Sequence, residues 1–451
     1  MKALGVVVAS VVSLSFAAPS TPAAPAVQDL RHSSAWWLGA LPQGEAKRKF
    51  ILDCTGCHQL DQSHAMLNAA HRPRQKWSDD ITRMLGFAGA STGFPVIAAD
   101  RNADQTAAWL SGALSTPDHS RAEPITTVRH LVDSAGARIT EYNMPEPGDL
   151  PHDVAVDSTG LVVITGMFSH SMYTLDPQTG RLTPTPLPVP QGGPRAVEID
   201  SAGNWWVLLG AGRSLARYEP RLLKWTTWPI DMYPHSIGIA NDGRIWYNGH
   251  FTRAPELIAA LDPRSGASTK HELPSHTALR DAGGPIPYEL RIAPDGRVWM
   301  SELQGNRMVV FDPKTNVSKT YEMPTTWSGP RRFDIDADGV LWIPLYSANQ
   351  LVRLDPRTDR LTVFDIPLAD AVPYVVRVDH ASRQLWIGTS AGDALLRFDT
   401  AHETWKIYPL PSRGALVRHM AIDPRTHDVW LAYGASPSAI PAKVARVQIL
   451  R

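Results

Sequence analysis

The residues best suited to chemistry stand together in the motif Cys54-Thr55-Gly56-Cys57-His58. Two thiols three residues apart can each bond covalently to one vinyl group of the same porphyrin, and the histidine that follows can ligate the iron. The chain has only two cysteines, and both belong to this motif. The spacing therefore predicts one covalently attached haem c, held by Cys54, Cys57 and His58.

Two other interpretations use the same thiols. Half of a zinc site would need a second ligand pair, and the sequence has neither another C-x-x-C nor an H-x-x-x-H. A thioredoxin-like dithiol would follow a strand in a βαβ unit and would not need His58. Haem attachment is therefore the favoured interpretation.

The composition limits the class of protein. A chain of 451 residues allows two or more domains, and its formal net charge of zero does not indicate binding to nucleic acid or to an anionic membrane. The 38 prolines and 15 tryptophans favour many short strands joined by tight turns.

The N-terminus resembles an export signal. Lys2 precedes an uncharged apolar run from Ala3 to Phe16, and the small residues up to Ala26 offer cleavage sites. An uncleaved anchor is the alternative, although the run is short for a membrane span. We predict a signal peptide over residues 1–26, a periplasmic mature protein and no membrane span after cleavage.

Residues 27–117 are predicted to form a small all-α domain around the C-x-x-C-H motif. The helical spacing of apolar residues favours three helices. They are Leu41–Asp53, Trp77–Leu85 and Ala103–Leu114. Ser78 or Asp79 is expected to cap the second helix, and the third is expected to begin after Asn102.

This arrangement resembles the small class I c-type cytochromes, in particular the cytochrome domains of several periplasmic dehydrogenases. The resemblance rests on C-x-x-C-H, then Trp-x-x-x-Ile-x-x-Met, then a helix with an aromatic residue. It implies a methionine as the sixth iron ligand, for which Met84 is the first choice and Met66 the second. His64, His71 or an open site are the remaining alternatives.

After a predicted linker at 118–137, the chain from 138 to 451 repeats itself. The repeat unit of about 43 residues has four short strands, with a tryptophan in the second strand of six units and an Asp-Pro or Glu-Pro turn at the end of the third strand of five units. The tryptophans are Trp206, Trp246, Trp299, Trp342, Trp386 and Trp430, with Val163 in the first unit. This pattern predicts an all-β propeller of seven blades.

The seventh unit lacks a clear fourth strand. The segment 138–145 has the pattern of a fourth strand but stands before the first unit of the repeat. It matches residues 319–324 of a complete unit. We therefore expect residues 138–145 to complete the last blade and close the ring, which removes exposed sheet edges.

One column of the repeat carries large polar residues, mostly after a proline at the start of the innermost strand. Because a propeller places equivalent positions on a circle, we expect these side chains to meet at one mouth of the axial channel. They are His152, Arg195, His235, Tyr288, Arg331, Tyr374 and Arg418, with Glu289 and Glu302 near the same end. They suit an anionic or carbonyl-bearing ligand, or they fill the channel by bonding to one another. Glu302 has the further alternative of pairing with Arg307.

The blade pattern resembles the virginiamycin B (streptogramin) lyase family of seven-bladed propellers, best over Trp299–Arg307. The resemblance implies catalysis by two histidines in Pro-His positions of consecutive blades, with carboxylates holding Mg²⁺. Here the Pro-His residues are His152 and His235, and Arg195 stands in the blade between them. The residues two positions before these histidines are Leu150 and Tyr233, and at one of these two positions the lyases have a metal-binding glutamate.

Three functions follow from these features. The main one is a mono-haem cytochrome whose propeller binds a substrate or a redox partner, so that a periplasmic electron donor or acceptor protein is expected. The second is a non-catalytic docking module for a dehydrogenase. The third is a lyase or hydrolase with an accessory haem. The sequence leaves open whether the propeller is catalytic, as an oxidoreductase or as a carbon–oxygen lyase.

Overall fold

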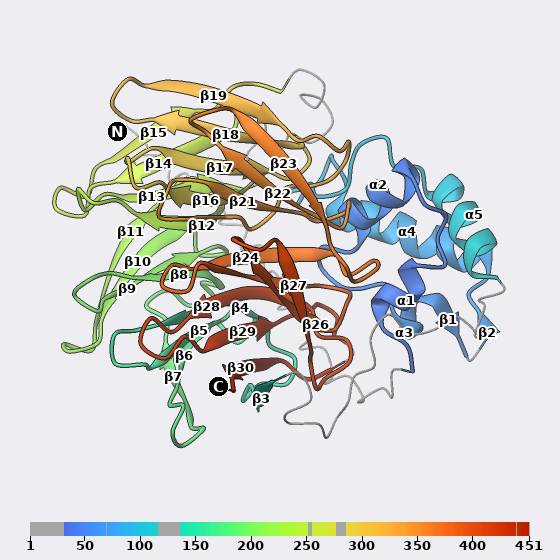
Figure 1. Ribbon diagram of the computed structural model, residues 1–451, viewed down its shortest axis with the longest axis horizontal. Coiled ribbons are helices and arrows are strands. Elements are labelled where there is room, and N and C mark those ends of the chain that lie inside the picture. The colour runs from blue at the N-terminus through green and yellow to red at the C-terminus, as the bar shows by residue number, and fades with distance from the viewer. Residues whose placement is uncertain are drawn as a thin grey trace, which may run out of the picture.

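The computed structural model describes residues 31–68, 70–115, 136–250, 255–276, 286–438 and 440–450. Helices come first along the chain and gather beside the sheets formed by the later residues (Figure 1). The predicted signal peptide and nearly all of the predicted linker lie outside the described residues. No helix within these ranges is both long and apolar enough to cross a membrane.

The helical part surrounds the C-x-x-C-H motif. Its helices are α1 (Ser34–Leu38), α2 (Glu45–Cys54), α3 (Gln62–Ala65), α4 (Arg74–Ala88) and α5 (Ala103–Leu114). A two-residue pair, β1 (Met66–Leu67) with β2 (Ala70–His71), follows α3. The motif thus begins on the last residue of α2 and continues into a turn.

The three predicted helices exist, but two have different starts. Helix α5 has the predicted bounds, and Asn102 accepts a hydrogen bond from the Gln105 amide at 3.0 Å. Helix α2 begins only after Gly44, whose φ of +129° is not helical. The predicted cap of the second helix is wrong, because α4 begins at Arg74 and Ser78 lies inside it, donating to Asp104 of α5 at 2.5 Å.

Seven four-stranded sheets follow, each forming one blade (Figure 1). The innermost strands are β4 (Pro151–Val156), β8 (Pro194–Ile199), β12 (Pro234–Ile239), β16 (Pro287–Ile292), β20 (Asp334–Ile335), β24 (Pro373–Asp379) and β28 (Val417–Ile422). The second strands are β5 (Val162–Gly166), β9 (Trp205–Leu209), β13 (Ile245–Gly249), β17 (Val298–Glu302), β21 (Leu341–Leu345), β25 (Gln384–Thr389) and β29 (Val429–Tyr433).

The outer half of each blade completes the sheet. The third strands are β6 (Ser171–Leu175), β10 (Ser214–Glu219), β14 (Leu257–Leu261), β18 (Arg307–Asp312), β22 (Gln350–Asp355), β26 (Ala394–Asp399) and β30 (Lys443–Ile449). The outermost are β7 (Leu182–Pro186), β11 (Lys224–Pro229), β15 (Ser268–Glu272), β19 (Val317–Glu322), β23 (Arg360–Asp365), β27 (Thr404–Pro409) and β3 (Ala137–Asn143).

Two sequence signals of the repeat are confirmed. The recurring tryptophans all lie on second strands and are at most 3% exposed, so they form the packing between blades. The recurring aspartate after the third strand accepts a hydrogen bond from the amide two residues later, for example Asp176 from Gln178 at 2.8 Å and Asp355 from Arg357 at 3.0 Å. This local bond explains why aspartate recurs at the turn.

The closing strand is also confirmed. Strand β3 pairs antiparallel with β30, in a register from Ala137 opposite Ile449 to Asn143 opposite Lys443. The last blade thus combines a strand from before the first blade with three from the end of the chain. The ring is held closed by main-chain hydrogen bonds as well as by packing.

The helical part packs directly on the propeller. A single apolar cluster contains Trp36, Phe50 and Leu52 of the helices together with Tyr346 and Tyr374 of the propeller. Polar contacts cross the same boundary: Lys47 pairs with Asp370 at 2.6 Å, and the Ala35 amide donates to the Ala391 carbonyl at 3.0 Å. The two parts therefore share one core at this face.

Candidate functional site

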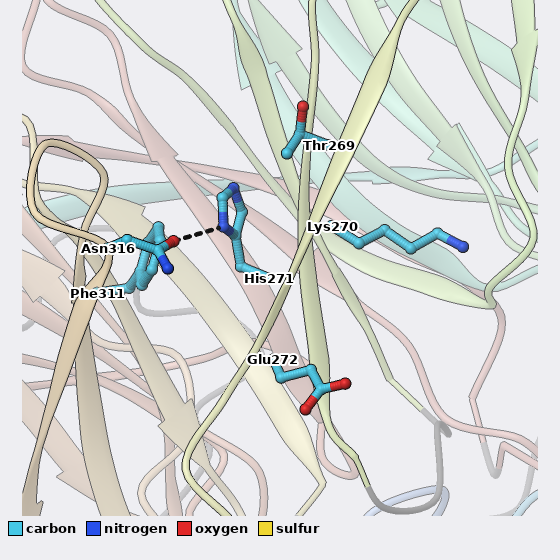
Figure 2. Close-up of a pocket in the computed structure, with 6 residues that line it drawn as sticks. All are labelled: Thr269, Lys270, His271, Glu272, Phe311 and Asn316. Atoms are coloured by element: carbon cyan, nitrogen blue, oxygen red, sulfur yellow. Dashed lines mark hydrogen bonds between the residues drawn. The ribbon is translucent and has the colours of Figure 1, made fainter.

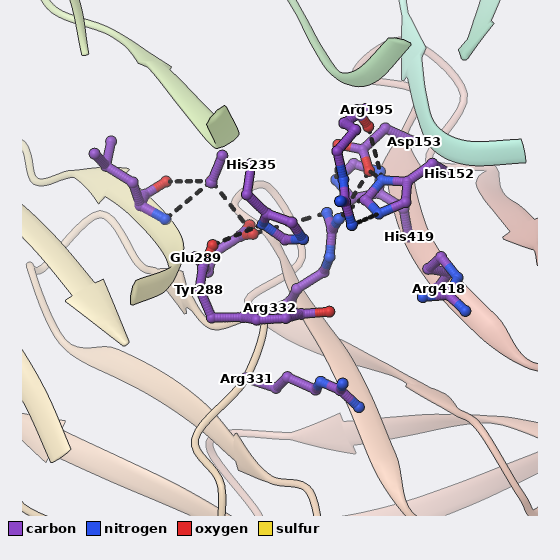
Figure 3. Close-up of polar contacts among 12 residues, drawn as sticks. His152, Asp153, Arg195, His235, Tyr288, Glu289, Arg331, Arg332, Arg418 and His419 are labelled. Carbon is purple, nitrogen blue, oxygen red and sulfur yellow. Dashed lines mark hydrogen bonds and ion pairs between the residues drawn. The ribbon is translucent and has the colours of Figure 1, made fainter. Parts of the chain in front are cut away.

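The ring of polar residues predicted from the repeat lies at the axis of the propeller. Six of the seven innermost strands start at or just before a ring residue, as at Pro151 before His152 and Pro234 before His235. Figure 3 shows His152, Arg195 and Arg332, which come from different blades, pointing toward one another. By their partners, most of the axial residues belong to an inner network or to a layer nearer the helical part.

The inner network consists of His152, Asp153, Glu289, Arg332, Arg377 and His419. Arg332 joins both carboxylates, with Asp153 at 2.9 Å and Glu289 at 3.7 Å. Arg377 lies 3.2 Å from Glu289 and 2.6 Å from Nε2 of His419. Each of these side chains is buried, so the network is a set of compensated charges inside the channel.

Arg332 reaches the axis because the fifth blade begins irregularly. Its innermost strand is only two residues long, starting at Asp334. Before that strand the chain pairs with the next blade instead: the Arg332 amide donates to the Tyr374 carbonyl at 3.2 Å, and the Val376 amide donates to the Arg332 carbonyl at 2.8 Å. This pairing places the Arg332 side chain in the channel, 1% exposed.

The two Pro-His histidines are fully buried and close together, with ring centroids 5.4 Å apart. Nδ1 of His152 lies 2.7 Å from the Arg195 carbonyl, and Nδ1 of His235 lies 2.8 Å from the Tyr288 carbonyl. Burial lowers the pKa of His152 to about 3 and holds that of His235 well below its usual value. Both rings are therefore neutral at pH 7, and each ties one blade to the next.

A second group, here called the mouth layer, consists of Tyr288, Arg331, Tyr346, Tyr374 and Arg418. The guanidinium of Arg331 lies over the rings of Tyr346 and Tyr374, 3.9 and 4.1 Å from their centroids. Arg418 donates to the Tyr374 hydroxyl at 3.0 Å, and the hydroxyls of Tyr288 and Tyr374 are 2.5 Å apart. Burial raises the pKa of Tyr374, but Arg331 and Arg418 outweigh it and lower the pKa to about 8.

The motif turn, Cys54–His58, lies on the mouth layer. Tyr346 donates to the Thr55 carbonyl at 2.7 Å, and Arg418 donates to the carbonyls of Gly56 and Cys57 at 3.3 and 3.2 Å. A Cβ at Gly56 would lie 2.8 Å from Nη2 of Arg331, so the guanidinium approaches the turn closely at this glycine. The mouth is therefore covered by the motif turn.

The motif residues have an arrangement that fits a haem. Cys54 and Cys57 are free thiols, and Nδ1 of His58 donates to the Gln59 carbonyl at 3.2 Å, which leaves Nε2 as the ligand atom. Burial, and then the neighbouring His64, lower the pKa of His58 to about 4, so the ring is neutral. Burial raises the pKa of Cys54 to about 12, which disfavours an exchange-active dithiol.

The candidates for the sixth ligand lie on different elements. Met84 is on α4 with its side chain partly exposed, whereas Met66 is on β1 and packs against the apolar cluster that Cys54 also contacts. His64 stacks on His58, with centroids 4.3 Å apart, and its Nδ1 lies 2.7 Å from Asp61. The choice of Met84 stays a prediction.

Only one of the two carboxylates predicted near the ring contacts the residues at the axis. Glu289 joins the inner network, but Glu302 pairs with Arg307 on the neighbouring strand at 2.5 Å, which was the alternative for it. Arg195 is held by the hydroxyl of Tyr233 at 2.7 Å and by His152 at 3.3 Å.

The sequence analysis missed several site residues. They are Asp153, Arg332, Tyr346, Arg377 and His419. Four of them lie on or just before innermost strands, one to three residues after a ring residue, so reading further along each innermost strand would have found them. Tyr346 follows a second strand, and no repeated pattern marks it.

The resemblance to the lyases also implies a divalent metal, and the residues present do not fit one. Asp153 is paired with Arg332, while Glu289 is paired with Arg291 at 3.0 Å and with Arg377. Within the part of the chain that the structure describes, no group of three or more His, Cys, Asp or Glu residues could hold a metal ion.

A separate pocket lies on the outer strands of the third and fourth blades (Figure 2). It is lined by Thr269, Lys270, His271, Glu272, Phe311 and Asn316. Nδ1 of His271 lies 3.2 Å from Oδ1 of Asn316. Four of the lining residues belong to β15, the outermost strand of its blade. The pocket is thus distinct from the axial residues.

No family model matches the chain. Virginiamycin B lyase of Nocardia farcinica (strain IFM 10152) is 28% identical over 181 residues, which are 40% of this chain and 57% of that protein. The chain therefore matches a little over half the length of this relative.

Two solved structures give the fold. A streptogramin B lyase superposes with a TM-score of 0.60 at 20% identity, covering 70% of this chain and 99% of that one. A catalytically inactive virginiamycin B lyase from Staphylococcus aureus with quinupristin gives 0.60 at 20% identity, covering 69% and 99%. The chain thus contains a seven-bladed propeller like that of the streptogramin B lyases.

Because Asp153 belongs to the buried inner network, we expect its loss to reduce the free energy of unfolding more than the loss of a carboxylate in an exposed ion pair. Asp153→Ala leaves Arg332 buried with one carboxylate partner fewer, and we expect it to lower the free energy of unfolding by about 3–5 kcal/mol. Asp231→Ala breaks the exposed pair with Lys270 and should cost less than about 1 kcal/mol. Urea unfolding followed by tryptophan fluorescence measures both, and equal costs would contradict the assigned network.

Proposed function

We propose that this chain is an exported c-type cytochrome that carries one haem on Cys54 and Cys57, with His58 as an axial ligand, and that transfers single electrons. Its propeller holds the motif turn and presents the haem to a periplasmic electron donor or acceptor protein. Export is part of the proposal, because c-type haem is attached outside the cytoplasm in bacteria.

The observation that carries the proposal is the seating of the motif turn. Three propeller groups hold its backbone: Tyr346, Arg418 and the amide of Ser436, which donates to the Cys57 carbonyl at 2.9 Å. The orientation of His58 by the Gln59 carbonyl supports the same conclusion, since an iron-ligating histidine usually donates its other N–H to such a group.

A bound haem supplies reversible one-electron transfer. The residues of the chain do the positioning. Cys54 at the end of α2 and Cys57 in the turn fix the macrocycle, while Tyr346 and Arg418 fix the turn against the propeller. Fixed geometry of this kind favours fast electron transfer, because little of the protein has to move when the iron changes its charge.

A propeller lyase with an accessory haem is the second candidate. The likeness to virginiamycin B lyase and the approach of His152 to His235 favour it. The environment of the two histidines is less favourable for catalysis by a lyase. Both are fully buried, both use Nδ1 to contact backbone carbonyls, and the motif turn covers the mouth.

The first test is haem attachment. Exported together with a haem-attachment system, the protein should gain the mass of one haem and show the absorption of a c-type haem after reduction with dithionite. Cys54→Ser/Cys57→Ser should lose the covalent haem, whereas Ser63→Ala, which leaves the motif intact, should retain it. Purified wild-type protein without covalent haem would contradict the proposal.

The second test concerns the sixth ligand. A thioether ligand stabilises the ferrous iron, so Met84→Ala should lower the reduction potential and let added imidazole bind the iron. Met66→Ala is the matched control and should leave both properties unchanged. If only Met66→Ala has these effects, Met66 is the ligand, and if neither variant does, the ligand is a histidine or the site is open.

The third test separates the cytochrome from the lyase. Incubation of the haem-loaded protein with quinupristin, followed by mass spectrometry, should leave the cyclic compound intact at the rate of the buffer control. Ring-opening that His235→Ala abolishes, while the haem spectrum stays the same, would instead support the lyase.

A further inference from the structure

We propose that two propeller residues, Arg331 and Arg418, raise the reduction potential of the haem carried by the motif turn. The propeller would then act as the electrostatic regulator of the cytochrome as well as its support. This inference rests on the proposed function, since it needs a haem on Cys54 and Cys57.

Both guanidiniums touch the motif turn itself. Arg418 bonds to two of its carbonyls, those of Gly56 and Cys57, and Nη2 of Arg331 lies 2.8 Å from where a Cβ on Gly56 would be. The covalent bonds from Cys54 and Cys57 keep the macrocycle at the same turn. A haem attached to these two thiols would therefore be tethered to the same turn that the two guanidiniums contact.

These two arginines differ in their charge compensation from Arg332 and Arg377 of the inner network. Arg332 and Arg377 are ion-paired with Asp153 and Glu289. The partners of Arg331 and Arg418 among the described residues are aromatic rings, a hydroxyl and carbonyls, all of which are uncharged. Moreover, Nε and Nη1 of Arg331 have no hydrogen-bond partner in the described part of the chain, although Arg331 is only 3% exposed.

Uncompensated positive charge disfavours the ferric state. Oxidation removes one electron from the haem and so adds one positive charge, and like charges repel more strongly where protein replaces water. At about 10 Å and an effective dielectric constant of about 20, one such charge shifts the ferrous-to-ferric equilibrium by roughly tenfold. Burial of both arginines also limits screening by salt.

The experiment is a spectroelectrochemical titration of the haem-loaded protein at pH 6, where Tyr374 is uncharged. Arg331→Gln and Arg418→Gln should each lower the ferrous-to-ferric ratio at a fixed potential by about tenfold, at both low and high salt. Arg418→Lys keeps the charge and should change the ratio by less than about threefold. Arg357→Gln removes an exposed, paired charge and should leave it unchanged.

A second variant separates charge from packing. Tyr346→Phe removes the hydrogen bond to Thr55 without changing any charge, so it should leave the ratio unchanged. A decrease as large as that of the arginine variants would show that the seating of the turn, and not its charge, sets the potential, and would overturn the inference.

The two proposals fail in different ways. Protein that carries no covalent haem overturns the proposed function and this inference with it. Protein that carries the haem, with the same ratio in Arg331→Gln, Arg418→Gln and wild type, overturns the inference alone.

Discussion

The structure depends on one constraint: a closed seven-bladed ring brings the starts of all its innermost strands around a single axis. Any charged residue that follows the start of such a strand is buried close to its equivalents in other blades. Burying a charge without a partner is costly, so the axis must supply partners for several guanidiniums at once. The pairing of β3 with β30 keeps the ring closed and therefore maintains this crowding.

The protein meets that requirement in two different ways along the axis. Deeper in the channel, Asp153 and Glu289 compensate Arg332 and Arg377 directly. At the mouth, tyrosine rings and the carbonyls of the motif turn receive Arg331 and Arg418. The helical part thus contributes to the axis, because its turn supplies two of the acceptors of Arg418. The shared apolar cluster around Tyr346 and Leu52 adds to the same contact.

Features that recur along the sequence could be predicted from it. The tryptophan of six second strands, the closing strand and the ring residues all follow from the repeat, because a repeated pattern fixes equivalent places in equivalent blades. Contacts made once could not be predicted. Arg332 enters the channel through an irregular start of the fifth blade, and Tyr346 meets Thr55 across the boundary between the two parts. Nothing local in the sequence encodes such a meeting. The pairing of Glu302 with Arg307, by contrast, was among the alternatives, because the two residues are close in the sequence and lie on adjacent strands.

The likeness to streptogramin B lyases and the C-x-x-C-H motif point to different chemistry, and the axis is where they can be reconciled. Here the motif turn lies over the mouth, and His152 and His235 contact the backbone of neighbouring blades. What the chain shares with the lyases is the fold. The positive charge at the mouth faces the motif turn, because Arg331 and Arg418 contact that turn and are not ion-paired within the described chain.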